Sequence, residues 1–293
     1  MLLYVLNPIK SLPNCRIQPP KSSNNLKRLR KDPNAIRLEV RHEEIETIFR
    51  IVPKRFFDNV LELGAGDGVQ SRLISKYSTK LLSTDLNQER LIQQYDPRID
   101  YDICDAENLK YASDHFDLIY SSNLLEHLPN PKKAILEMKR VMKDSGLMIH
   151  VVPNRFWKIL HLGLFYPHKM LTLIEFALFG AKNSSKSMNN NLKSNRSSSS
   201  LPGRILWPKT HGEYSGHIEE FISMGKPFWL QQFEDCDLQC VGLIKGLPAH
   251  SPYRFGINPL RKLCEYIGLS SCNGYVVTTT NNVSQYENLF EFK

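Results

Sequence analysis

Short apolar runs alternate with amphipathic stretches along the middle of the chain. Five runs have the length and composition of buried strands: 59–63, 81–85, 99–106, 116–120 and 147–152. Helical spacing of apolar residues begins at Ala35 and returns at 69–76 and 131–142. Strands that alternate with helices predict an α/β fold with a mostly parallel sheet, because a crossover helix joins each pair of parallel strands.

The pattern continues after residue 200 with a different order of elements. An amphipathic stretch at 219–236 predicts a helix, and apolar runs at 238–244 and 275–280 predict two further strands. The sequence pattern alone gives only these two extended runs, with an inserted helix predicted at 252–269 between them.

Three segments fall outside this alternation. Residues 1–34 combine prolines, a Ser-Ser-Asn-Asn run and basic residues, and 183–200 are almost entirely Asn, Ser and Lys, so both segments predict disorder. Residues 156–180, within an insertion at 155–182, are apolar and aromatic and are interrupted by Pro167. Three interpretations of this insertion remain open. They are a helical lid over an apolar acceptor, an interfacial anchor that gives peripheral membrane contact through 156–180, and a pair of helices packed on the core.

The composition is that of an ordinary globular protein with surplus positive charge. Hydrophobic residues make up 41% and charged residues 23% of the chain, and the net charge is +8. Much of the excess lies near the basic arm at 1–34, ahead of one folded domain at 35–293. No aromatic residues are interleaved with these charges, so no stable nucleic-acid partner is expected.

The cysteines and the apolar runs predict a cytoplasmic location. The six cysteines form no Cys-x-x-Cys pair, which argues against a zinc site of that type and favours a reduced compartment. The opening apolar residues are too few for a signal-peptide core. No apolar run reaches the length of about 18 residues that a membrane span needs.

The first predicted strand ends in a glycine-rich turn. Gly64, Gly66 and Gly68 occupy every second position after the apolar run, and Glu62 lies within that run. Glycines permit left-handed dihedral angles and leave the backbone open to a ligand. A dinucleotide site has the spacing G-x-G-x-x-G and holds a pyrophosphate, whereas an acid near the turn suits a cationic ligand. The turn therefore disfavours a nicotinamide-dependent oxidoreductase.

Two motifs resemble those of the class I S-adenosylmethionine-dependent methyltransferases, in particular the methyltransferase type 11 group. The turn from Glu62 to Gly68 resembles motif I of that family, and the segment 116–128, with its Leu-Glu-His-Leu, resembles its fourth strand. The resemblance covers about 55–153 and implies S-adenosyl-L-methionine as the cofactor. It also implies a Rossmann-like three-layer sandwich, with a mostly parallel seven-stranded sheet, a C-terminal antiparallel hairpin and an inserted helical lid.

The resemblance places cofactor-binding residues at the carboxyl ends of the predicted strands. Asp85 ends the second strand, where nucleoside-binding α/β folds place a carboxylate on the ribose hydroxyls. The alternative for this region is a helix N-cap, which Asp85 or Asn87 could provide. Asp105 is the candidate acceptor for the adenine amino group. The full predicted set is Glu62, Gly64, Ala65, Gly66, Gly68, Asp85, Leu86, Asp105, Ala106, Ser121 and Asn123.

Three histidines are candidates for the catalytic base. His127 follows the fourth strand, near the place where the methyl group should emerge, although it could instead brace the next helix. His211 and His217 precede the helix at 219–236, where this fold can bring acceptor-binding residues over the pocket. A metal site made of His211, Glu213 and His217 is compatible with the residue types, but the predicted set contains no metal.

The predicted function is transfer of a methyl group from S-adenosyl-L-methionine to an oxygen or nitrogen of a small-molecule acceptor, such as a glycan or a lipid-linked intermediate. A non-catalytic binding module with the same fold is one alternative. An RNA or protein methyltransferase is the other, favoured by the basic arm. The residues at 121–124 differ from the Asn-Pro-Pro-Tyr motif of enzymes that methylate amino groups of nucleic-acid bases.

Overall fold

The structure is a computed structural model, and most of the chain after residue 32 is described. The described residues are 33–52, 56–91, 95–179, 208, 210–212, 214–248, 263–264 and 266–285. All of them belong to the unit Asp32–Lys293, which is distinct from Met1–Lys31. The predictions for residues 1–32 of the arm, for the loop at 183–200 and for most of the helix at 252–269 lie outside the described residues. The last two positions of the predicted arm already belong to the first helix.

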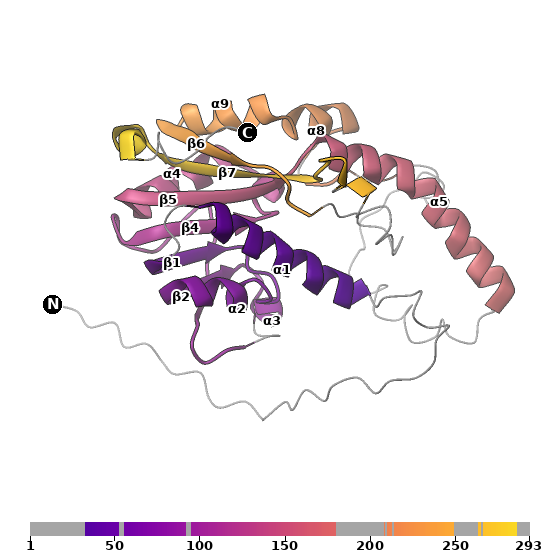
Figure 1. The fold of residues 1–293 in the computed structure, drawn as a ribbon, viewed down its shortest axis with the longest axis horizontal. Coiled ribbons are helices and arrows are strands. Elements are labelled where there is room, and N and C mark those ends of the chain that lie inside the picture. The colour runs from indigo at the N-terminus through magenta and orange to yellow at the C-terminus, as the bar shows by residue number, and fades with distance from the viewer. Residues whose placement is uncertain are drawn as a thin grey trace. The chain divides into compact units, whose positions relative to one another are not determined.

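Seven strands form one sheet in the order β3-β2-β1-β4-β5-β7-β6 (Figure 1). They are β1 Phe57–Leu63, β2 Ser78–Asp85, β3 Asp100–Ile103, β4 Phe116–Ser122, β5 Met142–Pro153, β6 Leu238–Ile244 and β7 Cys272–Thr279. The first five strands pair in parallel, and β7 runs antiparallel to both β5 and β6. The predicted α/β sheet with a C-terminal antiparallel hairpin is therefore confirmed.

The helices predicted from residue 35, within 69–76 and at 131–142 are present. The helices are α1 Pro33–Ile51, α2 Ser71–Ile74, α3 Gln88–Leu91, α4 Pro131–Val141, α5 Arg155–Phe179, α8 His217–Ser223 and α9 Lys226–Glu234. The 3-10 turns are η2 Ser75–Tyr77, η4 Leu125–His127 and η6 Thr280–Gln285.

One of the helix predictions is wrong in detail. The helix expected at 219–236 is two helices, α8 and α9, separated at Met224 and Gly225. A proline in the first turn of α9 suits a helix start, because its missing amide has no intrahelical partner there. Pro167, which interrupts the apolar stretch in the sequence, lies inside α5, and the helix continues through it.

Alternating side chains of the central strands build a core on each face of the sheet. Leu61 of β1 packs in one cluster with Ile135 of α4 and Phe233 of α9. Val60, its neighbour, packs in the other cluster with Ile48 of α1. Successive residues of a strand point to opposite faces, so β1 contacts both helix layers. The result is the predicted three-layer sandwich.

The N-terminal helix α1 packs beside β1, as its apolar spacing predicts. Ile45, Ile48 and Phe49 are fully or almost fully buried. Leu38, nearer the start of the same helix, is 43% exposed, whereas Val40 is buried. Among the side chains described from Arg37 onward, burial is therefore concentrated in the C-terminal part of α1.

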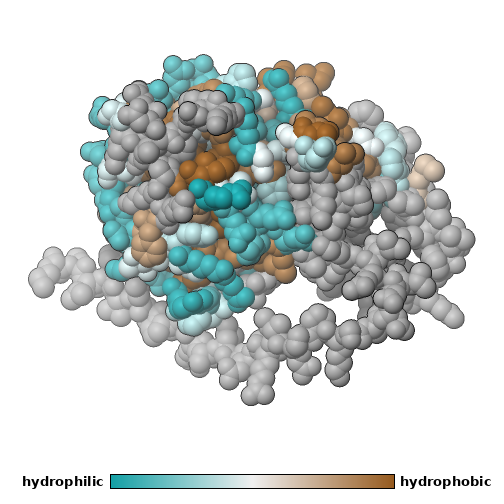
Figure 2. Space-filling view, in the orientation of Figure 1, coloured by the Kyte–Doolittle hydropathy of each residue, from teal (hydrophilic) through white to brown (hydrophobic). Residues whose placement is uncertain are grey.

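The helix α5 is buried only in part. Trp157 and Phe165 are buried, whereas other apolar side chains of α5 and of the neighbouring α8 are exposed (Figure 2). The exposed ones include Ile159, Tyr166, Met170, Ile218, Phe221 and Ile222. Among the described residues, no helix combines the length and apolar character needed to cross a membrane. The lid and the peripheral membrane contact stay predictions.

Candidate cofactor and acceptor site

The glycine turn after β1 adopts the conformation that its spacing predicts. Gly64, Gly66 and Gly68 have φ angles of 71°, 61° and 77°, in the left-handed region that favours glycine. The Ala65 amide donates a hydrogen bond to the Thr84 carbonyl at 2.9 Å. This bond fixes the turn to the carboxyl end of β2, so the bare backbone lies at the edge of the sheet where α/β folds bind ligands.

Close neighbours also require glycine in this turn. A Cβ atom at Gly64 would lie 2.9 Å from Cδ1 of Leu124, which follows β4. A Cβ atom at Gly66 would lie 3.1 Å from a guanidinium nitrogen of Arg90. The two sequence motifs, the glycine turn and the segment after β4, are therefore in direct contact.

Asp85 faces the glycine turn from the end of β2. Its Oδ2 accepts a hydrogen bond from the Gly66 amide and its Oδ1 accepts one from the Asn87 amide, both at 2.8 Å. The Asn87 side chain in turn accepts from the Arg90 amide at 3.1 Å, which caps α3. The N-cap considered for this region is thus provided by Asn87. Leu86, also predicted to contact the cofactor, is 66% exposed beside this carboxylate.

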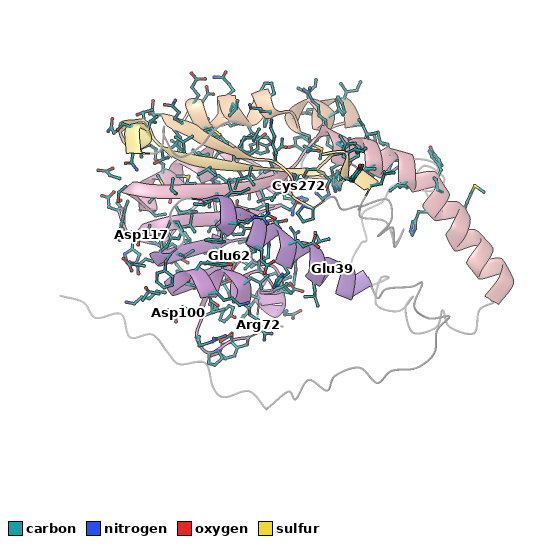
Figure 3. The ribbon with its side chains drawn as sticks, viewed as in Figure 1. Glu39, Glu62, Arg72, Asp100, Asp117 and Cys272 are labelled. Carbon is teal, nitrogen blue, oxygen red and sulfur yellow. The ribbon has the colours of Figure 1, made fainter. Side chains whose placement is uncertain are left out.

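Glu62 lies beneath the turn, inside the domain (Figure 3). It is 1% exposed and accepts a hydrogen bond from Ser83 Oγ at 2.9 Å. Burial raises the pKa of Glu62 to about 7, although the hydroxyls of Ser71 and Ser83 favour its charged form. Its hydrogen bonds therefore go to hydroxyls of α2 and β2 inside the domain.

Asp105 and Ala106 follow β3, at the same edge of the sheet as Asp85. Asp105 is exposed, and its Oδ1 accepts a hydrogen bond from the Glu107 amide at 2.9 Å. Ala106 is 6% exposed and packs in the core cluster on the α4 side. The carboxylate of Asp105 thus reaches solvent from a loop whose backbone is anchored.

The two predicted residues at the end of β4 differ in their exposure. Ser121 is buried, and its hydroxyl lies 2.8 Å from Nδ1 of His150. Burial lowers the pKa of His150 to about 3, so this imidazole is neutral. Asn123 is half-buried with a φ of 50°. With its amide oxygen turned toward Arg41, Asn123 accepts two hydrogen bonds at 2.9 and 2.7 Å.

A buried carboxylate of α1 organises the region between the glycine turn and β4. Glu44 is 1% exposed, and its Oε1 accepts hydrogen bonds from Gln70, Tyr120 and Ser122 at 2.7, 3.0 and 2.8 Å. Its Oε2 accepts from Arg41 at 2.8 Å. Sequence patterns give no sign of this network, because its members lie up to 78 positions apart and no local motif joins them.

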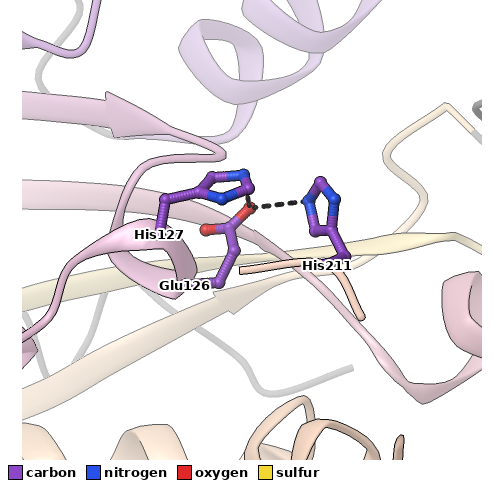
Figure 4. Close-up of side chains that lie close together, drawn as sticks. All are labelled: Glu126, His127 and His211. Atoms are coloured by element: carbon purple, nitrogen blue, oxygen red, sulfur yellow. Dashed lines mark ion pairs between the residues drawn. The ribbon is translucent and has the colours of Figure 1, made fainter. Parts of the chain in front are cut away.

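A second cluster lies just beyond β4 and contains Glu126, His127 and His211 (Figure 4). Oε1 of Glu126 lies 3.9 Å from Nε2 of His127 and 3.8 Å from Nε2 of His211. The Glu126 side chain is 1% exposed, whereas those of His127 and His211 are 42% and 29% exposed. Both histidines are among the residues predicted from the sequence. Glu126 is not, although it stands within the Leu-Glu-His-Leu motif.

Gly212 holds the segment of His211 against this cluster. It has a φ of 83°, and a Cβ atom there would lie 2.1 Å from the carbonyl oxygen of Glu126. The ring of His211 packs between those of Trp157 and His127, with centroid distances of 4.6 and 4.4 Å. The contact between the two segments is thus built from backbone and ring packing together.

His217 occupies a different environment from the other two candidate histidines. Its Nδ1 lies 2.7 Å from Nζ of Lys158, and its Nε2 lies 2.9 Å from the carbonyl oxygen of Pro208. Lys158 also forms a fully buried ion pair with Glu220 of α8. Both ring nitrogens of His217 are therefore engaged. Glu213, the third member of the metal set considered from the sequence, lies outside the described residues.

The fold and this edge of the sheet define a class I methyltransferase architecture, and the comparisons with known proteins agree. Residues 61–150 match the family model described as a methyltransferase domain. This range contains the glycine turn, Asp85, Asp105 and the segment after β4. The resemblance to the class I S-adenosylmethionine-dependent methyltransferases is therefore confirmed, and the family match spans residues 61–150.

Proteins with related sequences match only part of this chain. The ubiquinone biosynthesis O-methyltransferase of Coxiella burnetii is 27% identical over 106 residues, which are 34% of this chain and 45% of that protein. An uncharacterized protein of Methanocaldococcus jannaschii is 29% identical over 160 residues, 51% of this chain and 69% of that protein. The matched region thus spans less than half the length of the Coxiella relative.

Solved structures match a larger part of the chain. An S-adenosylmethionine dependent methyltransferase from Mesorhizobium loti has a TM-score of 0.50 at 12% identity and covers 80% of this chain and 97% of its own. A chain from the complex of the Haloferax volcanii Trm112 methyltransferase activator with a methyltransferase has a TM-score of 0.51 at 14% identity. That match covers 84% of this chain and 92% of the other. These matches confirm the fold.

Proposed function

We propose that the protein transfers a methyl group from S-adenosyl-L-methionine to an oxygen or nitrogen of a small-molecule acceptor. The observation that carries the proposal is the hydrogen bond of 2.8 Å from the Gly66 amide to Asp85 Oδ2, across a turn of three left-handed glycines. This arrangement leaves bare backbone and a carboxylate at the same edge of the sheet.

The residues at this edge fit the cofactor. Asp85 would hold the ribose hydroxyls, and Asp105 would accept from the adenine amino group. The turn from Gly64 to Gly68 has no Cβ atoms at its three glycines to obstruct the aminoacyl end. The buried charge of Glu62 beneath the turn favours a cationic ligand. When bound, S-adenosyl-L-methionine supplies an electrophilic methyl group next to a sulfonium that leaves readily.

The cluster beyond β4 would face the acceptor. His127, shortly after the end of β4, and His211 present partly exposed imidazoles that both approach Oε1 of Glu126. The acceptor oxygen or nitrogen would form a bond to the methyl carbon as the carbon–sulfur bond breaks toward sulfur. The proton of an oxygen acceptor would pass to an imidazole or to water. The O-methyltransferase name of the Coxiella relative favours an oxygen acceptor.

Two further parts of the proposal, the type of acceptor and the cellular location, are each supported by one observation. The glycan or lipid-linked character of the acceptor is supported by the exposed apolar side chains of α5 and α8. A cytoplasmic location is supported by the described cysteines, all of which are free thiols. They are Cys104, Cys236, Cys240, Cys264 and Cys272.

Calorimetric titration of the wild-type protein with three ligands tests the cofactor class. We expect S-adenosyl-L-methionine and its demethylated product, S-adenosylhomocysteine, to bind at one site, and NADH not to bind. Preference for NADH would favour an oxidoreductase. Binding of none of the three would favour the binding module, and either result would contradict the proposal.

A further inference from the structure

We propose that Glu126, His127 and His211 bind a divalent transition-metal ion of the zinc class. This site differs from the sequence-based prediction, which contains no metal and considers His211 only together with Glu213 and His217. Oε1 of Glu126 and one ring nitrogen of each histidine lie within 4.8 Å of one another, and the Glu126 carboxylate lies beside the two packed rings (Figure 4).

The first observation is a buried carboxylate that lacks hydrogen bonds. Glu126 is 1% exposed, and neither of its oxygens has a hydrogen-bond partner in the described part of the chain. The imidazole nitrogens lie 3.8 and 3.9 Å away, beyond hydrogen-bond distance. Burying a carboxylate in this way is costly unless a cation or donors compensate for the lost water. A bound metal ion would supply that compensation.

The second observation is the spacing of the three ligand atoms. Ligands held about 2.1 Å from one zinc ion in tetrahedral geometry lie roughly 3.4 Å apart. The two separations to Glu126 exceed this value by about half an ångström, and the two histidine nitrogens lie within 4.8 Å of each other, so rotations of the partly exposed imidazoles would have to bring the three atoms together. Two imidazoles and one carboxylate favour zinc, cobalt or nickel over magnesium, which prefers oxygen ligands.

The third observation is that the backbone holds the ligands together. Glu126 and His127 belong to the 3-10 turn η4, directly after the buried strand β4. His211 comes from a segment 84 positions later, counted from His127 to His211, and Gly212 packs its backbone on the Glu126 carbonyl oxygen. Trp157 supports the His211 ring at 4.6 Å. The site is thus assembled by the fold rather than by flexible side chains alone.

The partly exposed imidazoles of His127 and His211 would let solvent reach a bound ion. Three protein ligands with an open fourth position are typical of catalytic zinc sites, where water or a substrate oxygen completes the shell. Metal binding itself does not depend on methyl transfer. The consequence that the ion would hold an acceptor oxygen does rest on the proposed function. Binding of the metal and binding of S-adenosyl-L-methionine are therefore measured separately.

The experiment is titration of chelator-treated, tag-free protein with Zn²⁺ by calorimetry and with Co²⁺ by visible absorption. We expect one equivalent to bind to the wild type. Glu126→Gln and His211→Ala should each weaken binding about 100-fold or more, since even outer-shell changes cost about 10- to 100-fold. His42→Ala, which removes an exposed histidine of α1 that pairs with Glu46, is the matched control and should bind as the wild type does.

Several results would overturn the proposal. They are no binding to the wild type, equal binding to Glu126→Gln and wild type, or a cobalt spectrum with a thiolate charge-transfer band, which would place the ion at a cysteine. Glu126→Gln removes an uncompensated buried charge, so we expect it to fold. A rise in thermal unfolding temperature on adding Zn²⁺ to the wild type, absent in Glu126→Gln, provides a second readout.

Discussion

The Gly66 amide and the Asp85 carboxylate are joined by a hydrogen bond of 2.8 Å across 19 positions of the chain. The bond connects the glycine turn after β1 to the end of β2. Because Asn87 caps α3, the Asp85 carboxylate is not needed as a helix cap. This relationship fixes a negative charge beside bare backbone, which is the core of the proposed cofactor site.

Gly66→Ala should destabilise the protein and weaken S-adenosyl-L-methionine binding. The residue has a φ of 61°, and forcing alanine into the left-handed region costs about 1–2 kcal/mol. The new Cβ would also lie 3.1 Å from the Arg90 guanidinium. Urea unfolding and calorimetry measure the two effects.

Gly163→Ala is the matched control for that substitution. Gly163 lies within α5, and a Cβ atom added there would meet no neighbouring atom within 4 Å, so alanine should raise helix stability by up to about 1 kcal/mol. Cofactor binding should be unchanged. If both variants behave alike, the special role of the glycine turn is wrong.

Glu62 should make the wild type less stable as pH rises from about 4.5 to about 7. Burial raises its pKa in the folded protein to about 7, so the folded state binds more protons than the unfolded state across this window. The stability that Glu62 contributes is fully present below its pKa in the unfolded state. It is lost as the pH rises through its pKa in the folded state. The change in stability is on the order of 3 kcal/mol, because the pKa of Glu62 rises from 4.5 to about 7 on folding.

Glu62→Gln should remove that dependence. The difference in unfolding free energy between variant and wild type, measured by urea unfolding from pH 4 to pH 8, should move in favour of the variant as pH rises. Glu46→Gln, at an exposed position of α1, is the control and should show no such trend. A constant difference between Glu62→Gln and wild type would show that Glu62 titrates normally.

The buried pair of Lys158 and Glu220 should behave as a unit. Lys158→Met leaves the Glu220 carboxylate buried without its cation and should cost about 3–5 kcal/mol of stability. Adding Glu220→Leu should recover most of that loss, because the uncompensated charge is gone. Lys132→Met, which removes a surface partner of Asp235, should change stability little. Losses that simply add in the double variant would contradict the coupling.

Gly212→Ala should separate His211 from Glu126. A Cβ atom would lie 2.1 Å from the Glu126 carbonyl oxygen, so the segment must move. We expect lower thermal stability and loss of the cobalt spectrum expected for the metal site. Gly216→Ala, in the same segment and with no atoms within 4 Å of the added Cβ, should leave both unchanged. A normal cobalt spectrum in Gly212→Ala would show that His211 is not a ligand.

The sequence predicts the sheet, and places the glycine turn and the two acids at its carboxyl edge, because these features depend on local patterns. The apolar runs, the glycine spacing and the acids after β2 and β3 are each readable within a few residues. The network of Glu44 and the contact of His211 with Glu126 are not, since they join segments far apart in the chain. The single helix predicted at 219–236 failed for a different reason, because helical apolar spacing continues across the turn at Gly225.

The most direct test of the proposed cofactor site is calorimetric titration of S-adenosyl-L-methionine into the wild type, Asp85→Ala and Asp100→Ala. Asp100 begins β3 at the amino end of the sheet and serves as the matched control (Figure 3). We predict that the wild type and Asp100→Ala bind alike and that Asp85→Ala, folded by its thermal transition, binds at least about tenfold more weakly. Equal affinity of Asp85→Ala and wild type would contradict the proposed site.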